Sequence, residues 1–265
     1  MTKIVAISNQ KGGVAKTTTT FSLGACLVEL GYSTLVVDLD SQSNLTMAAG
    51  LDPDELTWTI ADLFDSPGGA ILEEIRSAVI QPTTMDGLTL LPADVRLASV
   101  ERNLYDKDNY EYLLKQTLQF WPEFDYILLD CPPSLSAITL MALTAAQTVL
   151  IPVQSEYYAA RGLGRLLDIV EAVQARTNPT LLYYLFVTMF DKRNNINHSV
   201  LEQLQTHFAD HLLETIIGVD TRLRESPVAG EPIIHYAPST RSSEQYRALT
   251  REFDARINTQ KSQEV

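Results

Sequence analysis

One segment of the chain has the residue types and spacing to bind a chain of phosphates. Gln10–Thr18 reads QKGGVAKTT and lies between an apolar run, Lys3–Ser8, and a stretch with helical character that begins at Thr17. A strand–loop–helix unit of this kind presents backbone N–H groups and the positive end of the helix to an anion. Gly12 and Gly13 allow the backbone to curve around phosphates without a Cβ clash.

The side chains of this segment match the parts of a bound Mg·ATP. Lys16 is placed to reach the β- and γ-phosphates, and the hydroxyl of Thr17 to coordinate Mg²⁺. Thr18 can add a contact to the α-phosphate. The loop residues expected to bind ATP are Lys11, Gly12, Gly13, Val14, Ala15, Lys16, Thr17 and Thr18. We therefore predict ATP and Mg²⁺ as cofactors, against the plainer alternative of a glycine turn followed by a helix lysine.

Aspartates at the ends of two expected strands could complete the magnesium site. STLVVD leads into DLDSQSN, which contains Asp38 and Asp40, and YILLD ends in Asp130. Ligands of open α/β sheets bind at the carboxyl ends of the strands, where these side chains would meet. We predict that all three contact Mg²⁺ through water, although a single aspartate at a strand end is commonly only a turn or helix cap.

The elements that would position these residues alternate in type, which is typical of a mostly parallel sheet. The expected strands are Lys3–Ser8, Ser33–Asp38, Leu88–Pro92, Tyr126–Asp130, Thr148–Val153 and Leu181–Thr188. The expected helices are Thr17–Leu30, Ala160–Arg176, Asn197–Phe208 and Ser239–Ile257. Leu51–Asp86, with several prolines and glycines, reads as a short-helix insertion. We expect one α/β domain over residues 1–257 and a polar, frayed tail over 258–265.

Composition limits the classes of protein that this chain can be. Apolar residues make up 45% of it, and no apolar run approaches the roughly 20 residues that cross a bilayer. The amino terminus has no signal-peptide pattern, and Cys26 and Cys131 are too far apart for a metal motif. We expect a cytoplasmic protein with reduced thiols. Its net charge of −13 would repel DNA, so DNA binding would require a local basic patch.

The loop fails the ordinary GxxxxGK[ST] pattern, because Gln10 and Ala15 stand at its two glycine positions. It fits KGGxxK[ST] instead, with an early Lys11, and in this it resembles the ParA/MinD family of deviant-Walker-A ATPases. The resemblance continues through residues 125–170, 185–195 and 221–253. It implies a doubly wound, mainly parallel sheet flanked by helices, of the P-loop NTPase type.

The resemblance also implies roles for individual residues. Lys11, Lys16 and Asp40 would be catalytic: Lys11 would cross a dimer interface to the partner's nucleotide, and Asp40 would orient the attacking water. Asp38 would support the magnesium shell. Met189 and Asp220 are the candidates for contacts to adenine, although Gly218–Asp220 departs from the family's usual Pro-x-Asn.

Further departures lie in the loop and in the segment around Asp40. Ala15 replaces a usual glycine, and Ser41 and Ser43 replace the usual proline and glycine. These changes leave the charged residues in place and make the backbone of the two segments less predictable.

The implied partners are a second copy in an ATP-dependent sandwich dimer, non-specific nucleoid DNA, and an adaptor protein that stimulates hydrolysis. Arg222 and Arg224 match the family's basic segment, and Arg241, Arg247 and Arg251 on the last helix could assist. The alternative is that these arginines are solvated or paired with neighbouring glutamates. The expected location is the cytoplasm, on the nucleoid.

The cargo stays open between a plasmid or chromosome locus and a protein body such as a carboxysome or a chemoreceptor cluster. A MinD-like membrane ATPase should end in a basic amphipathic helix, whereas the last residues here contain Ile257 as their one strongly apolar side chain. An iron–sulfur carrier would need clustered cysteines. A metabolic P-loop enzyme would need a substrate pocket, for which we find no motif.

Overall fold

The computed structural model describes residues 2–65, 70–156 and 159–261. Their central feature is a seven-stranded sheet in the order β3-β4-β2-β5-β1-β6-β7. Only the edge pair β3–β4 is antiparallel; the other neighbours pair in parallel. The strands are β1 (Lys3–Ile7), β2 (Thr34–Asp38), β3 (Gln81–Pro82), β4 (Leu88–Leu91), β5 (Tyr126–Asp130), β6 (Thr148–Gln154) and β7 (Leu182–Thr188). The predicted fold class is confirmed.

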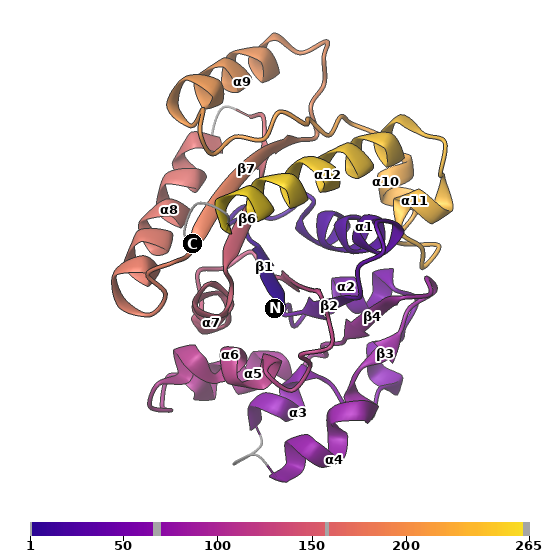
Figure 1. Cartoon of the computed structure of the whole chain (residues 1–265), viewed down its shortest axis with the longest axis vertical. Coiled ribbons are helices and arrows are strands. Elements are labelled where there is room, and N and C mark those ends of the chain that lie inside the picture. Colours follow the sequence, from indigo (N-terminus) through magenta and orange to yellow (C-terminus); the bar gives the residue numbers. More distant parts are fainter. Residues whose placement is uncertain (1, 66–69, 157–158, 262–265) are drawn as a thin grey trace.

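Helices cover both faces of this sheet, as Figure 1 shows for α1 and α12 on one side and α5, α6 and α7 on the other. The longer helices are α1 (Lys16–Glu29), α4 (Ala70–Val79), α5 (Leu97–Leu104), α7 (Ala137–Ala145), α8 (Ala159–Arg176), α9 (Asn195–His207) and α12 (Arg241–Lys261). The shorter ones are α2 (Asn44–Ala48), α3 (Ile60–Asp65), α6 (Leu113–Leu118), α10 (Arg222–Glu225) and α11 (Ile233–Tyr236), with 3₁₀ turns at Pro53–Glu55 and Tyr110–Tyr112.

The apolar core is divided by the sheet into two clusters, because successive side chains of a strand point to opposite faces. Val5 and Ile7 pack with α1 and α12 residues such as Phe21 and Phe253, whereas Ala6 between them packs into the cluster that includes Leu143 of α7. A parallel strand covered on both faces is therefore apolar throughout, which explains why these strands stand out in the sequence.

The predicted strands lie within one residue of the observed ones at each end, and two details differ. β3 was not predicted, since Gln81 and Pro82 carry no strand signal and proline is tolerated only at a sheet edge. Leu51–Asp86 holds short helices, as expected, but also this strand. The predicted tail begins too early, because α12 continues through Lys261. Residues 262–265 lie outside the described residues.

Helix α1 lies unusually close to the sheet at Gly24. A Cβ atom at this position would lie 2.8 Å from Cγ1 of Val36 and 3.1 Å from Cδ1 of Leu88, both of which are buried. The absence of a side chain thus lets the backbone of α1 approach β2 and β4. This close approach fixes the start of α1 beside the carboxyl end of β1, where the phosphate-binding segment lies.

We predict that Gly24→Ala lowers the free energy of unfolding by about 1–2 kcal/mol, because overpacking outweighs the better helix propensity of alanine. Gly164→Ala in α8 is the matched control. Its Cβ would meet open space, so this change should raise the free energy of unfolding by up to about 1 kcal/mol. Urea denaturation of both variants checks this. Equal stabilisation by the two changes would mean that α1 can move away from the sheet.

Candidate active site

A cavity of about 360 Å³ opens where the first loop, the segment after β2 and the loop after β7 meet. Its lining includes the predicted residues Gly12, Gly13, Ala15, Lys16, Thr17, Thr18, Asp40 and Met189, and also Asn44, Ala48, Cys131, Pro133 and Pro227. The structure therefore brings together residues that lie far apart in the sequence. Lys11, Val14, Asp38, Asp130 and Asp220 were predicted for the site as well and are not among the lining residues.

The loop backbone is shaped to receive an anion. Gly13 and Ala15 have φ angles of 72° and 66°, in the left-handed region, and α1 begins at the next residue, Lys16. Among the described residues, no side chain caps this helix start, so its first N–H groups face the cavity side. The left-handed conformation costs an alanine about 1–2 kcal/mol relative to the right-handed one, which explains the family's glycine at position 15.

Lys16 is the buried cation of the cavity, with a relative exposure of 8%. Its Nζ donates to the backbone oxygen of Lys11 at 3.3 Å. Burial lowers the pKa of Lys16, and the nearby charge of Asp130 acts in the opposite direction. A desolvated ammonium with one long hydrogen bond is well placed to bind phosphate oxygens.

Asp130 ends β5 in register with Asp38 of β2, so two carboxyl groups lie side by side in the interior. Oδ1 of Asp130 accepts from the hydroxyl of Thr20 at 3.2 Å, whereas Oδ2 is buried without a hydrogen-bond partner among the described residues. Burial, and then the charge of Asp38, raises the pKa of Asp130 to about 8. The hydroxyl of Thr17 lies close enough to Asp130 to act on its pKa in the opposite direction. An unsatisfied carboxylate oxygen beside this threonine fits the hydration shell of Mg²⁺.

Asp38 has a different environment from the one predicted. Its Oδ2 accepts from the backbone N–H of Thr46 at 2.9 Å and from the Thr46 hydroxyl at 2.8 Å, and its Oδ1 accepts from the N–H of Asp40 at 3.1 Å. Asp38 therefore fastens the segment that carries Asp40 to the end of β2. A contact to the magnesium shell stays a prediction for Asp38, whereas Asp40 does face the cavity.

The two candidates for adenine contacts separate in the structure. Met189, with a φ of 54°, lines the phosphate cavity. Asp220 instead accepts hydrogen bonds from the hydroxyl of Ser242 and, at 3.0 Å, from the N–H of Arg222. Its role at adenine stays a prediction. Pro227, which the sequence did not single out, lines the cavity from a distant part of the chain.

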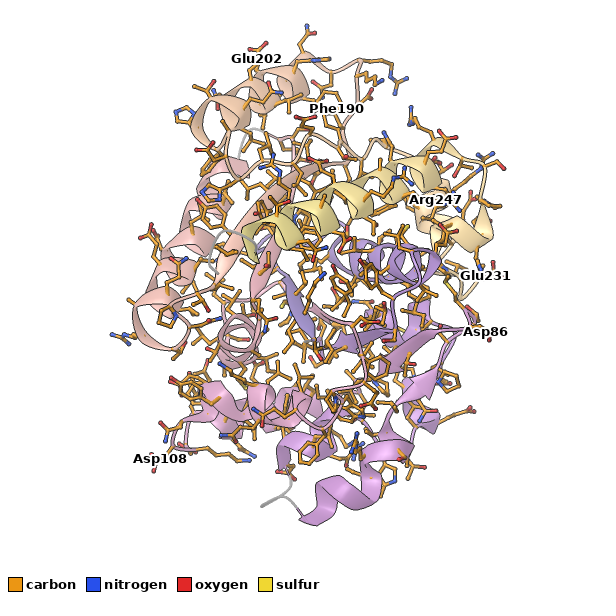
Figure 2. The ribbon with its side chains drawn as sticks, viewed as in Figure 1. Asp86, Asp108, Phe190, Glu202, Glu231 and Arg247 are labelled. Carbon is orange, nitrogen blue, oxygen red and sulfur yellow. The ribbon has the colours of Figure 1, made fainter. Side chains whose placement is uncertain are left out.

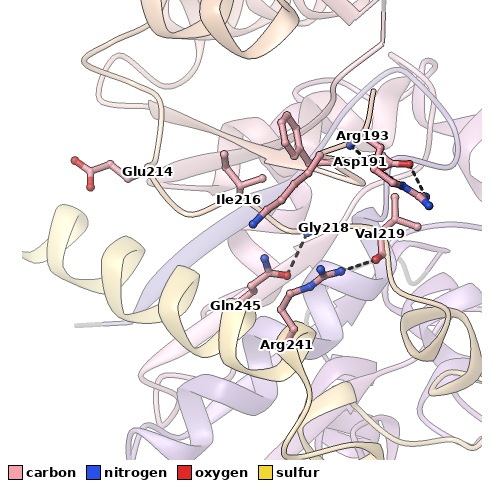
Figure 3. A pocket seen from close by; sticks show the side chains of 10 residues that line it. Asp191, Arg193, Glu214, Ile216, Gly218, Val219, Arg241 and Gln245 are labelled. Carbon is pink, nitrogen blue, oxygen red and sulfur yellow. Dashed lines mark hydrogen bonds and ion pairs between the residues drawn. The ribbon is translucent and has the colours of Figure 1, made fainter. Parts of the chain in front are cut away.

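A second and larger pocket, of about 530 Å³, lies beside the loop after β7 (Figure 3). Arg241 donates to the backbone oxygen of Val219 at 2.8 Å, and Arg193 pairs with Asp191 at 2.9 Å. Lys192 also lines this pocket, so three cations surround it. Lys192 and Arg193 were not predicted from the sequence as site residues. Their segment, residues 185–195, was noted only for its resemblance to the ParA/MinD family.

The predicted DNA-binding arginines differ in their surroundings. Arg222 and Arg224 on α10 and Arg251 on α12 are exposed. Arg247, labelled in Figure 2, forms two hydrogen bonds with the carboxylate of Glu29, at 2.7 and 2.8 Å. Arg247 is thus an ion-paired surface arginine, as the alternative interpretation expected, and its charge is largely neutralised by the carboxylate of Glu29 on α1.

A phosphate loop between β1 and α1, a buried strand-end aspartate beside Thr17, and Asp40 facing the same cavity define a P-loop ATPase site for Mg·ATP. A family described as an AAA domain matches residues 2–183. The chain is 40% identical over 257 residues to the sporulation initiation inhibitor protein Soj of Bacillus subtilis, covering 96% of this chain and 99% of that protein. It belongs to the ParA/Soj family of partition ATPases.

Two further similarities agree with this assignment. The chain is 41% identical over 254 residues to the chromosome partitioning protein ParA of Myxococcus xanthus, covering 94% and 87% of the two chains. It also resembles a crystal structure of cobyrinic acid a,c-diamide synthase from Mycobacterium smegmatis with bound ATP analog and magnesium. The TM-score is 0.82 at 35% identity, covering 99% and 97% of the chains. Within the described residues, no helix is long and apolar enough to cross a membrane.

We predict that the nucleotide-free protein in EDTA loses stability as the pH rises from 6 to 8. The pKa of Asp130 is higher in the folded state than in the unfolded state. Between pH 6 and 8 the folded protein therefore holds a proton that the unfolded protein has already lost, and a rise in pH favours unfolding. The slope is up to about 1.4 kcal/mol per pH unit. Asp130→Asn should flatten it, whereas Asp86→Asn at an exposed position (Figure 2) should not. Denaturation midpoints at both pH values measure this, and identical slopes in all three proteins would contradict it.

Proposed function

We propose that this ATPase forms a homodimer when ATP is bound, binds non-specific DNA in that state, and positions or segregates a cargo. An adaptor would stimulate hydrolysis and so release the dimer from the nucleoid. The observation that carries the proposal is the position of Lys11. It opens the phosphate-binding segment, but its ammonium lies at Gln154 and Glu156 at the end of β6, which supports a role at a second subunit's nucleotide.

In the proposed site, Lys16 binds the terminal phosphates while Thr17 and, through water, Asp130 hold Mg²⁺. Bound Mg²⁺ shields the negative charge of the β- and γ-phosphates. Asp40 orients the attacking water from the segment that Asp38 fastens to β2. The partner subunit's Lys11 then neutralises charge that develops on the phosphates, as an arginine finger does.

The proposed DNA surface consists of Arg222, Arg224 and Arg241 with Lys192 and Arg193 beside them. Asp220 accepts from the N–H of Arg222, and Arg241 donates to the carbonyl of the neighbouring Val219. Cations contribute to non-specific affinity by releasing counterions from phosphates, and dimerisation would double their number against the net charge of −13. Arg251 can add to this surface, whereas Arg247, held by Glu29, and Arg193, paired with Asp191, contribute less.

The names of the curated relatives favour a DNA locus as cargo over a protein body, since both concern chromosome partitioning or sporulation. A metabolic enzyme acting on a small substrate stays the alternative. It is favoured by the name of the similar structure from Mycobacterium smegmatis. Binding of DNA separates the two functions, because a small-substrate enzyme has no reason to bind DNA only with ATP.

We predict that Asp40→Ala binds ATP with nearly wild-type affinity and loses at least about 100-fold in turnover, since only the water-orienting carboxylate is removed. Lys16→Ala should instead lose ATP binding, because it removes the buried cation of the cavity. Fluorescent-nucleotide titration and phosphate release measure the two steps. Normal hydrolysis by Asp40→Ala would show that another group orients the water.

We predict that the wild-type protein binds non-specific duplex DNA with ATP but not with ADP, and that this binding weakens steeply with salt. Arg222→Glu combined with Arg224→Glu should weaken it about 10-fold or more without changing ATP-dependent dimerisation. Arg76→Glu with Arg102→Glu, on α4 and α5 far from α10 in Figure 1, makes the same change in net charge and serves as control.

Fluorescence anisotropy with a labelled duplex measures this DNA binding. Equal losses in the two double variants would mean that only the overall charge matters. Absence of DNA binding by the wild type with every nucleotide would favour the metabolic alternative.

A further inference from the structure

The side chain of Lys11 is held inside its own subunit. Its Nζ donates to Oε1 of Gln154 at 2.9 Å and forms an ion pair with the carboxylate of Glu156. Gln154 is the last residue of β6, and Glu156 follows two positions later. Lys11 is therefore directed towards the end of β6, across from the cavity that its neighbours Gly12 and Gly13 line.

The three side chains form a closed network rather than one contact. Nε2 of Gln154 donates to Oε1 of Glu156 at 2.5 Å, while Oε2 of Glu156 takes the lysine. The amide of Gln154 and both oxygens of Glu156 are thus engaged, and together they specify one orientation of the Lys11 ammonium. We call this network the Lys11 clasp.

The backbone around Lys11 is tied to β6 as well. The N–H of Lys11 donates to Oδ1 of Asn9 at 3.0 Å, and Nδ2 of Asn9 donates to the oxygen of Pro152 at 2.7 Å. Asn9 is buried, so this link is shielded from water. The start of the loop and the end of β6 therefore behave as one unit, which keeps the clasp partners within reach of each other.

Both loop lysines thus have partners inside the nucleotide-free subunit. Lys16 bonds to the backbone oxygen of Lys11, and the Lys11 side chain bonds to the clasp. ATP binding in the same subunit would give Lys16 a phosphate partner, whereas the ammonium of Lys11 lies at the end of β6, bonded to Gln154 and Glu156. In the proposed dimer, the phosphates of the second subunit compete with Glu156 for Lys11.

We propose that Glu156 and Gln154 retain Lys11 in the free subunit and release it only to the nucleotide of a second subunit. This inference rests on the proposed dimer. It makes Glu156 a positioning residue that sets the concentration at which ATP-bound subunits associate. Each dimer requires two clasps to open, so the contact disfavours chance encounters of subunits and is overcome when two nucleotides are present.

The clasp is weak enough to raise the concentration at which subunits associate without preventing their association. The side chains of Lys11 and Glu156 are 38% and 50% exposed, and ion pairs this open to water favour the paired state by about 1.5- to 5-fold. A triphosphate carries several negative charges and outcompetes a single carboxylate. Opening of two clasps therefore weakens dimerisation by about 2- to 25-fold, the product of two such factors.

The first test is the dimerisation midpoint with a non-hydrolysable ATP analogue, measured by analytical ultracentrifugation. Glu156→Gln should lower the midpoint concentration by about 2- to 25-fold, because the neutral amide holds Lys11 less tightly. Gln154→Leu should lower it as well, because this change removes the hydrogen bond to Lys11 and the one that orients Glu156. Glu123→Gln is the matched control, since the pair of Arg76 with Glu123 is similarly exposed and lies elsewhere. ATP affinity of the single subunits should stay equal in all of them.

A second measurement examines the clasp without the dimer. Lys11 in the nucleotide-free protein should react with an amine-modifying reagent about 1.5- to 5-fold faster in Glu156→Gln than in wild type, by mass spectrometry. Exposed Lys192 in the same samples provides the reference rate. Unchanged reactivity of Lys11 would overturn the clasp itself.

The outcomes separate this inference from the function on which it rests. A wild type that never dimerises with ATP would refute the proposed dimer, and the regulatory role of the clasp with it. A wild type that dimerises while Glu156→Gln associates no better, or less well, would refute the inference alone. In that case Glu156 would contribute to the dimer instead of opposing it.

Discussion

Parallel pairing of β5 with both β1 and β2 is the constraint on which the site depends. It sets Asp130 in register with Ile7 on one side and with Asp38 on the other. The phosphate loop leaves from β1, the Asp40 segment leaves from β2, and the strand-end aspartate comes from β5. Since carboxyl ends of parallel strands share one edge, a slip of this register would separate the loop from its carboxylates.

The same constraint forces charge into the interior. Asp38, Asp130 and Lys16 are all buried, and burial shifts the pKa of each towards the neutral form. Such groups destabilise the nucleotide-free protein, and a bound anion with its cation can satisfy them. Asp38 is accommodated by three hydrogen bonds from the following segment, whereas one oxygen of Asp130 has no hydrogen-bond partner in the described part of the chain. The second arrangement is the one that favours a metal.

The two lysines at the ends of the phosphate loop have different surroundings. Lys16 is buried in the cavity and serves its own subunit, whereas Lys11 is half-buried and tied to β6. The two residues are five positions apart, and the left-handed backbone of Gly13 and Ala15 lies between them. In the proposed dimer, Lys16 would hold the nucleotide of its own subunit and Lys11 would contact the nucleotide of the second subunit.

The sequence by itself determined the fold class, the positions of all the described strands except β3, the phosphate loop and the strand-end aspartates. These features are local, because apolar runs covered on both faces and a glycine-rich turn before a helix need few distant contacts to be recognised. Tertiary structure alone decided that Glu29 holds Arg247, that Ser242 donates a hydrogen bond to Asp220, and that Gln154 and Glu156 hold Lys11. Each of these depends on side chains that meet across long separations in the chain, where residue type gives no sign of the partner.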